Sequence, residues 1–308
     1  MFIKKAKVYD STIDNPVSNE YPTPPESFKQ PCLHMIVGQR TSGKSYLSSK
    51  ILAQTHKDKT FNRIYIITPS FNSNKSYFGK YIKEEDIYEP TKESISKVIA
   101  AVEADRDAWE EYLKKLTHYK KFKSEIHDKK IHISDEDVIT YMEYGFFDKQ
   151  KPTWKYNTIE PPKSLLIMDD ILGSPAILQS SGLTRIATLN RHIAPLQENH
   201  SNRSACGLAV MILTQSYKMQ SGISRVLREN VSLLTLFKNK QEKQIEAIKE
   251  ELANVVDIEC FDEAYVNATS EKHGSLTIDF TPKTPCKTFR KNLNEFIVFE
   301  KLGGCDCK

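Results

Sequence analysis

The chain has 308 residues, which is enough for one large α/β core or for a core with a small appended domain. Hydrophobic residues make up 39% and charged residues 27%, a balance that excludes wholesale disorder and is typical of a globular protein. The net charge of +4 permits contact with nucleic acid without arguing for it, and every apolar stretch is shorter than the ~20 residues of a membrane helix.

The cysteines and the first residues predict a reducing compartment. Six cysteines are scattered through the chain, a pattern that suits reduced thiols better than a disulfide framework. The terminal Cys305-Asp306-Cys307 has no second pair, so a frayed tail is favoured over a metal site. The opening Met1–Lys5 lacks the apolar core of a secretory signal, and we therefore expect a cytoplasmic or nucleoplasmic protein.

In chain order, a proline-rich segment over residues 1–31 predicts an extended arm, and strands then alternate with helices. Five apolar runs of strand length are bounded by turn-forming residues. These runs are Leu33–Val37, Arg63–Thr68, Ser164–Met168, Leu208–Leu213 and Val231–Phe237. Their alternation with helices predicts an α/β fold with a mostly parallel central sheet and helices on both faces. His34, inside the first run, is expected to be a hydrogen-bonded core histidine.

Two helical regions interrupt the strand pattern. Residues 91–124 carry apolar side chains three to four positions apart, which predicts one long amphipathic helix or two. Ser134, with Asp137 three residues later, predicts an N-cap for a short helix through Tyr144.

These patterns divide the chain into a core and two flanking segments. The arm ends at about residue 31, and the core spans residues 32–237 with a helical insertion at about 91–147. Residues 238–308 predict a C-terminal extension with two helices, a strand at Ser275–Phe280 and a tail.

A phosphate-binding motif follows the first predicted strand. The segment Gly38-Gln39-Arg40-Thr41-Ser42-Gly43-Lys44-Ser45 fits G-x-x-x-x-G-K-[ST] in full, between a strand and a helix. Its glycines let backbone N–H groups wrap a polyphosphate at a helix N-terminus. Lys44 would supply charge to the β- and γ-phosphates, and the Ser45 hydroxyl is a hard ligand for Mg²⁺. The motif predicts that all eight residues bind ATP.

A pair of acids follows the third predicted strand. Ser164–Met168 delivers Asp169 and Asp170 to the carboxyl end of its strand, the edge where ligands bind in open α/β sheets. We expect Asp169 to hold Mg²⁺ and Asp170 to polarise the attacking water.

With these residues in place, the chain resembles the viral DNA-packaging ATPases of nucleocytoplasmic large DNA viruses and virophages, within the FtsK/HerA group of P-loop motors. The resemblance covers about residues 32–237. Besides the P-loop and the aspartate pair, it rests on Asn190-Arg191-His192, on Met211-Ile212-Leu213-Thr214-Gln215-Ser216 and on Leu227-Arg228-Glu229-Asn230. In that family a polar residue after the sensor strand detects the γ-phosphate, and Gln215 matches it. Arg228 and Asn230 match the R-x-N that follows.

Two positions depart from the family or leave a choice. Many relatives have Glu where this chain has Asp170, one methylene shorter, which makes the base less secure than the Mg²⁺ ligand. The resemblance also implies an arginine that acts on a neighbouring subunit's nucleotide, and both Arg191 and Arg203 precede the sensor strand. The sequence does not choose between them.

The resemblance implies a RecA-like P-loop core that uses ATP and Mg²⁺. It also implies a homo-oligomeric ring that moves double-stranded DNA into a capsid, with a capsid or portal vertex protein as a partner. The expected location is the host cytoplasm or virus factory, with association with the virion left open. Two alternatives stay open, a P-loop phosphotransferase acting on a small acceptor and a nucleotide-dependent scaffold with little turnover.

Overall fold

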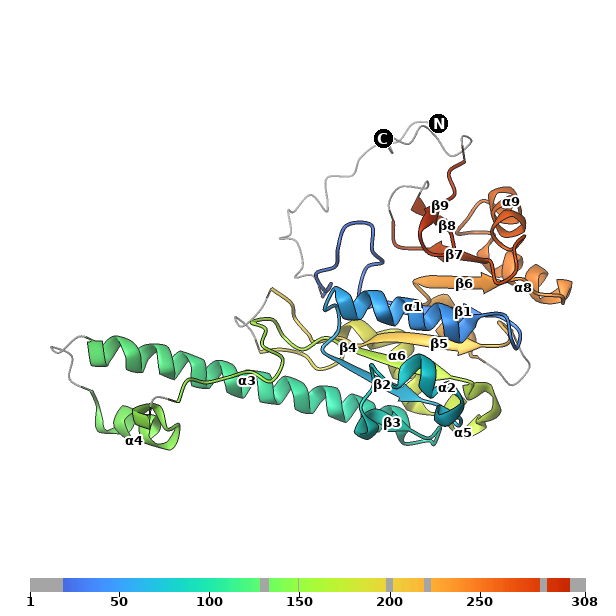
Figure 1. The fold of residues 1–308 in the computed structure, drawn as a ribbon. Helices are drawn as coiled ribbons and strands as arrows, with labels where there is room; N and C mark the ends of the chain where they lie inside the picture. Colours follow the sequence, from blue (N-terminus) through green and yellow to red (C-terminus); the bar gives the residue numbers. More distant parts are fainter. Residues whose placement is uncertain are drawn as a thin grey trace, which may run out of the picture.

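The computed structural model describes residues 19–127, 133–148, 150–197, 202–218, 223–282 and 287–299. Most of the predicted arm and the Cys305–Cys307 pair lie outside these residues. Within them, nine strands form a single sheet in the order β3-β2-β4-β5-β1-β6-β7-β8-β9 (Figure 1). Helices cover the sheet on both faces, which confirms the predicted α/β class.

Six neighbouring strands run parallel and place their carboxyl ends at one edge. They are β1 (Leu33–Val37), β2 (Arg63–Ile67), β3 (Ile87–Tyr88), β4 (Ser164–Asp169), β5 (Ala209–Thr214) and β6 (Leu233–Phe237). The five predicted runs all form strands within two residues of their expected limits, and the sixth of these parallel strands, the two-residue β3, lacks a sequence prediction. Because β5 lies between β1 and β4, one strand separates the P-loop strand from the aspartate strand.

The continuous apolar runs suit strands that are buried on both faces. Along β1, Met35 and Val37 belong to the core on one face, whereas Ile36 between them belongs to the core on the other. The second face is covered by α1 (Lys44–Lys57) and α2 (Phe71–Phe78).

The first face is covered by the N-terminal half of α3, by four short helices and by α9. These elements are α3 (Ser94–His127), α5 (Pro175–Leu178), α6 (Ser181–Leu189), α7 (Arg225–Glu229), α8 (Glu242–Leu252) and α9 (Ile258–Ala268). Short 3-10 turns add η2 (Glu84–Asp86), η3 (Phe146–Asp148), η4 (Ile171–Gly173) and η5 (Asn190–His192). Among the described residues, no helix is long and apolar enough to cross a membrane.

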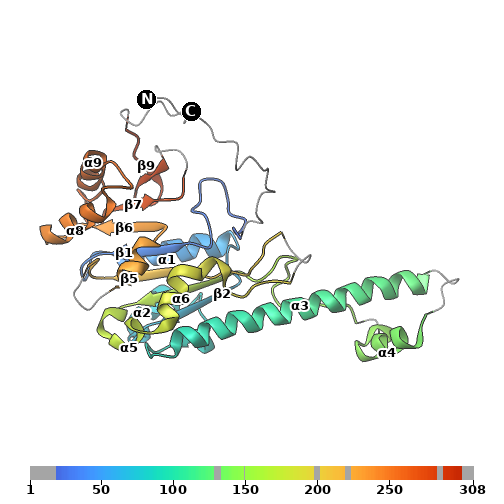
Figure 2. The same ribbon diagram turned by 180° about the vertical axis from the view of Figure 1, so that it is seen from behind.

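The helical insertion projects away from the sheet. α3 is one continuous helix, which settles the choice between one helix and two, and its far half extends beyond the body with α4 (Asp135–Glu143) at its end (Figure 1, Figure 2). Ser134 accepts a hydrogen bond from the Asp137 N–H, as its predicted N-cap role requires. A small aromatic core of Phe122, Tyr141 and Phe146 holds α4 against α3.

The C-terminal segment continues the same sheet. β7 (Ser275–Asp279) pairs antiparallel with β6, and β8 (Phe289–Lys291) and β9 (Glu295–Phe296) extend the edge further. Because β7 runs against β6, the start of β7 lies at the edge where the parallel strands end. Residues that precede Ser275 therefore come close to the P-loop.

Candidate nucleotide-binding site

The P-loop joins the end of β1 to the first turn of α1. Gly38 has no room for a side chain, because a Cβ there would lie 2.4 Å from Ser42 Oγ and 3.0 Å from Phe237. Gly43 has a φ of 112°, which other residues rarely adopt, and Thr41 is left-handed at a φ of 65°. The loop thus returns the chain to a helix N-terminus, whose free N–H groups attract anions.

Lys44 places its ammonium group on the loop. Its Nζ donates to Gly38 O at 2.6 Å and to Gln39 O at 3.1 Å. Burial lowers the pKa of Lys44, and the charges of Asp169 and Asp170 oppose that shift. The side chain therefore contacts the phosphate loop and lies near enough to both acids to feel their charges.

Asp169 is a buried carboxylate at the end of β4. The residue is 6% exposed, and Asn74 Nδ2 on α2 donates to its Oδ2 at 2.8 Å. Burial raises the pKa of Asp169 to about 6, with a further rise from Asp170, while Lys44 and Asn74 act in the opposite direction. A nearby cation would favour the ionised form of such an acid.

Asp170 has different surroundings from its neighbour. It is exposed and left-handed, with a φ of 54°, a conformation that Asp tolerates better than most residues. Gln215 Nε2, at the end of β5, donates to Asp170 Oδ1 at 3.2 Å. The fold thus brings together two predicted groups that are 45 residues apart in sequence.

Three further polar residues contact the site, and the sequence did not single them out. Asn74 contacts Asp169, His273 Nδ1 lies 2.9 Å from Ser42 O, and Asn239 Oδ1 accepts from Gln39 Nε2 at 3.1 Å. Asn239 comes two residues after β6, so the rule that ligands bind at the strand ends could have found it, whereas Asn74 lies on α2, seven residues past β2. His273 precedes β7 and could not be placed without knowing that β7 is antiparallel.

A polar cavity of about 320 Å³ opens beside the start of the P-loop. It is lined by Gln39, Gln215, Ser216, Asn239, Gln241 and Gln244. The cavity joins the phosphate loop to the first turn of α8.

The loop and acids fit a magnesium-bound nucleoside triphosphate. Ser42 Oγ is buried and has no hydrogen-bond partner among the described residues. It lies against Gly38, where a Cβ would be 2.4 Å away, so a glycine at this position lets the loop pack closely on itself. A hydroxyl from Ser45 and a carboxylate from Asp169 are hard oxygen ligands of the kind that Mg²⁺ prefers. Arg40 and Thr41 are exposed at the loop's tip.

The two candidate arginines lie near the amino ends of the parallel strands, on the side of the sheet opposite the P-loop. Arg191 is exposed in η5, and the carbonyl of its neighbour Asn190 accepts from the N–H of Leu208, just before β5 begins. Arg203 is 7% exposed and donates to Cys206 O and Pro161 O at 3.2 and 2.7 Å. Because both precede the amino ends of strands, neither arginine lies near the P-loop of its own chain.

The R-x-N residues also lie away from the phosphate loop. Arg228 forms an ion pair with Glu251 on α8, with N–O distances of 2.9 and 3.0 Å. Asn230 Nδ2 donates to Val226 O at 2.8 Å. Their contacts are with α7 and α8 rather than with the acid pair.

Comparisons with known proteins concern structure alone. No protein-family profile and no curated protein sequence matches the chain. Among solved structures, the genome packaging NTPase B204 from Sulfolobus turreted icosahedral virus 2, in complex with ATP-gammaS, is 14% identical, and the match covers 85% of this chain and 97% of that one with a TM-score of 0.44.

Two further structures match over part of their length. The pCW3 conjugation coupling protein TcpA is 16% identical, with 70% of this chain and 51% of that chain covered at a TM-score of 0.38. The Type VII secretion ATPase EccC from Thermomonospora curvata is 12% identical, with 68% and 21% covered at 0.34. At such identities the chemistry must be established from this chain's own residues.

Proposed function

We propose that this chain hydrolyses ATP with Mg²⁺ and uses the energy to move double-stranded DNA into a viral capsid. The observation that carries the ATPase assignment is the meeting of three groups at one sheet edge. Lys44 forms hydrogen bonds with the phosphate loop, and the charge of the buried Asp169 raises the pKa of Lys44. Asp170 accepts a hydrogen bond from Gln215. A phosphate cradle, a cation ligand and a paired polar group for water are the parts that phosphoryl transfer needs.

Each residue has a separate task in this proposal. Lys44 and the loop N–H groups orient the β- and γ-phosphates, and Ser45 and Asp169 hold Mg²⁺. Mg²⁺ held by these two residues would neutralise charge that develops on the phosphate oxygens. Asp170 accepts a hydrogen bond from the attacking water and so orients the water's lone pair toward the γ-phosphorus. Gln215 holds Asp170 in place through its hydrogen bond.

The assembly part of the proposal depends on the arginines. An arginine at the amino ends of the strands, opposite the P-loop, can reach a nucleotide only in a neighbouring copy, which requires a head-to-tail contact between copies. Such contacts form a ring when the rotation between neighbouring copies closes. Arg191 is exposed, whereas the guanidinium of Arg203 is buried against two carbonyls. We therefore assign the trans-acting role to Arg191.

Phosphate release in the presence of different acceptors tests this function. A DNA motor should release phosphate from ATP faster when duplex DNA is added. Stimulation by a small-molecule acceptor, with the phosphate transferred rather than released, would instead identify a phosphotransferase. Binding of ATP with no turnover under either condition would identify a nucleotide-dependent scaffold.

A further inference from the structure

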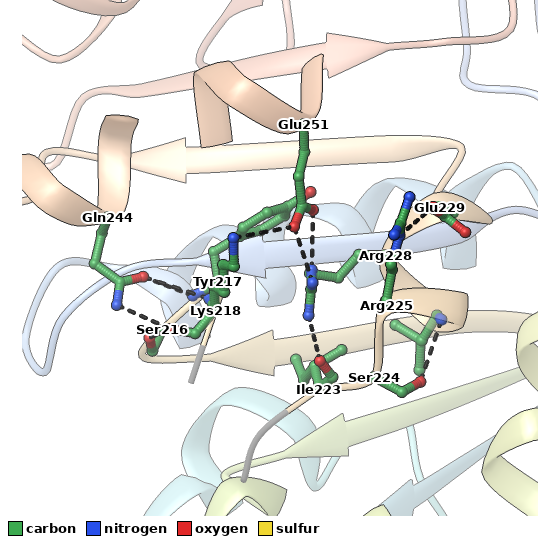
Figure 3. Close-up of polar contacts among 11 residues, drawn as sticks. Ser216, Tyr217, Lys218, Ile223, Ser224, Arg225, Arg228, Glu229, Gln244 and Glu251 are labelled. Atoms are coloured by element: carbon green, nitrogen blue, oxygen red, sulfur yellow. Dashed lines mark hydrogen bonds and ion pairs between the residues drawn. The ribbon is translucent and has the colours of Figure 1, made fainter. Parts of the chain in front are cut away.

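The segment that follows Gln215 is attached to α8 by one side chain. Gln244 Oε1 accepts from the N–H of Tyr217 at 3.2 Å and from that of Lys218 at 3.5 Å. Gln244 Nε2 in turn donates to Lys218 O at 3.1 Å. Figure 3 shows this amide facing the backbone of residues 216–218. A single glutamine on α8 therefore fixes the chain two to three residues beyond Gln215.

A second attachment lies on the other side of Tyr217. Tyr217 is 3% exposed, and its ring lies against the Arg228 guanidinium, 5.5 Å from ring centroid to Cζ. Arg228 forms two parallel hydrogen bonds with Glu251, and its Nη1 donates to Ile223 O at 2.5 Å (Figure 3). Two-point arginine–carboxylate pairs fix orientation as well as distance. The pair thus holds Tyr217 between α7 and α8.

The side chain of Gln215 has no comparable packing of its own. Gln215 is exposed, so its place depends on the backbone that carries it. Thr214 closes the turn around it, because its Oγ1 donates to Ser216 O at 2.9 Å. Gln215 and Gln244 also line the same cavity beside the P-loop. The end of β5 fixes one side of Gln215, and α8 fixes the other.

We propose that Gln244 and Glu251, both on α8, are positioning residues that hold Gln215 against Asp170. This inference rests on the proposed hydrolysis of ATP. Among the described residues, neither side chain forms a hydrogen bond with the P-loop or with the two acids. Gln244 acts through the backbone of Tyr217 and Lys218, and Glu251 acts through Arg228. Displacements of about 1 Å at a catalytic group can slow a reaction on the order of 100-fold, so loss of either attachment should be visible in the rate.

Steady-state kinetics of Gln244→Ala and Glu251→Gln test the inference, with Glu250→Gln as the matched control. Glu250 is an exposed neighbour on the same helix. We expect kcat to fall roughly 10-fold or more in both test variants, with KM for ATP changed by less than about twofold, because ground-state binding by the P-loop is untouched. Glu250→Gln should match the wild type. Alanine favours helix, so Gln244→Ala should leave α8 folded. It therefore still tests the inference if Glu251→Gln fails to fold.

The decisive readout is the same pair of substitutions in a Gln215→Ala background. If α8 acts through Gln215, neither substitution should slow that variant further, whereas an equal loss in both backgrounds would overturn the inference. Wild-type kcat in Gln244→Ala would also overturn it. If the wild type itself fails to hydrolyse ATP, the proposed function fails separately. Hydrogen exchange over residues 209–218 then decides the positioning role, which predicts faster exchange in both test variants than in Glu250→Gln.

Discussion

Gln215 Nε2 donates to Asp170 Oδ1 over 3.2 Å and so joins the carboxyl ends of β5 and β4. Asp169, one residue earlier, points instead into a buried position and accepts from Asn74. Two adjacent acids thus have different environments, one dry and one exposed. Pairs of carboxylates in contrasting surroundings commonly divide the work of a site.

We predict that Asp169→Asn and Asp170→Asn have different defects. Asp169→Asn should raise the Kd for ATP in the presence of Mg²⁺ roughly 10-fold or more, because the cation loses a charged ligand. Asp170→Asn should bind ATP almost as tightly as the wild type but lower kcat on the order of 100-fold, since the water loses its base. Equilibrium binding of a fluorescent ATP analogue and single-turnover hydrolysis measure the two effects. Equal losses of affinity would show that the roles are divided wrongly.

Asn74 should matter for metal-dependent binding although it is remote from the P-loop in sequence. Asn74→Ala removes the hydrogen bond that orients Asp169 Oδ2, and we expect Mg²⁺-dependent ATP affinity to fall about 3- to 10-fold, in the range of other residues that orient metal ligands. Asn72→Ala is the control, because Asn72 is exposed on the same short helix. Titration of Mg²⁺ at fixed ATP checks this. An identical response from both variants would remove Asn74 from the site.

His34 should make stability depend on pH. Burial lowers its pKa from 6.5 to about 3, and its Nε2 lies 2.8 Å from Thr235 Oγ1, as expected for a core histidine. The unfolded chain therefore binds a proton that the folded chain does not, so the stabilisation is present above about pH 6.5 and is lost as the pH falls toward 3. At about pH 4.5 the loss would be roughly 2–3 kcal/mol.

Chemical denaturation across this pH range measures the effect of His34. His34→Gln is polar but does not titrate, so its free energy of unfolding should fall less steeply with acid than that of the wild type. His56→Gln, on the exposed surface of α1, is the control and should keep the wild-type slope. Parallel pH profiles for all three proteins would contradict the prediction.

Arg191 and Arg203 should fail in different ways. Arg191→Ala should keep the wild-type Tm and lose most ATP hydrolysis, because an exposed side chain contributes little to folding but would supply charge to a neighbour's γ-phosphate. Arg203→Ala should lower Tm, since it leaves the buried carbonyls of Pro161 and Cys206 without their donor.

A mixing experiment separates a trans role of Arg191 from a local one. Arg191→Ala retains an intact P-loop, and Lys44→Ala retains its arginine, so mixed assemblies should recover part of the activity that each variant lacks alone. Specific activity of the wild type should also rise with protein concentration. No recovery on mixing, together with activity that is unchanged on dilution, would favour a self-contained enzyme.

Local sequence signals predicted those parts of the site that are contiguous in the chain. The eight residues Gly38–Ser45 form a loop and the start of α1 with their own glycine requirements, and Asp169 ends an apolar strand that needs no partner to be recognised. Gln215 could be placed at the same edge because parallel strands end together. The rule applied equally to Asn74, but a single amide seven residues past a strand has no distinctive spacing.

The remaining contacts depend on tertiary pairing. His273 reaches Ser42 only because β7 runs antiparallel to β6, and the direction of an added strand is not encoded in its own residues. Arg191 and Arg203 were indistinguishable in sequence, because their different exposures depend on how residues 191–207 fold back before β5. Arg228 matched a family motif, but its partner Glu251 lies 23 residues later on α8.

The rate of phosphate release from ATP by Lys44→Ala tests the central claim most directly. Lys44 contributes charge to the loop and little to the core, so the variant should fold normally and lose nearly all hydrolysis. Lys50→Ala, an exposed lysine on the same helix, should hydrolyse ATP at the wild-type rate. Duplex DNA should accelerate the wild type and Lys50→Ala but not Lys44→Ala. A folded Lys44→Ala protein that releases phosphate as fast as the wild type would contradict the assignment of this loop as the catalytic ATP site.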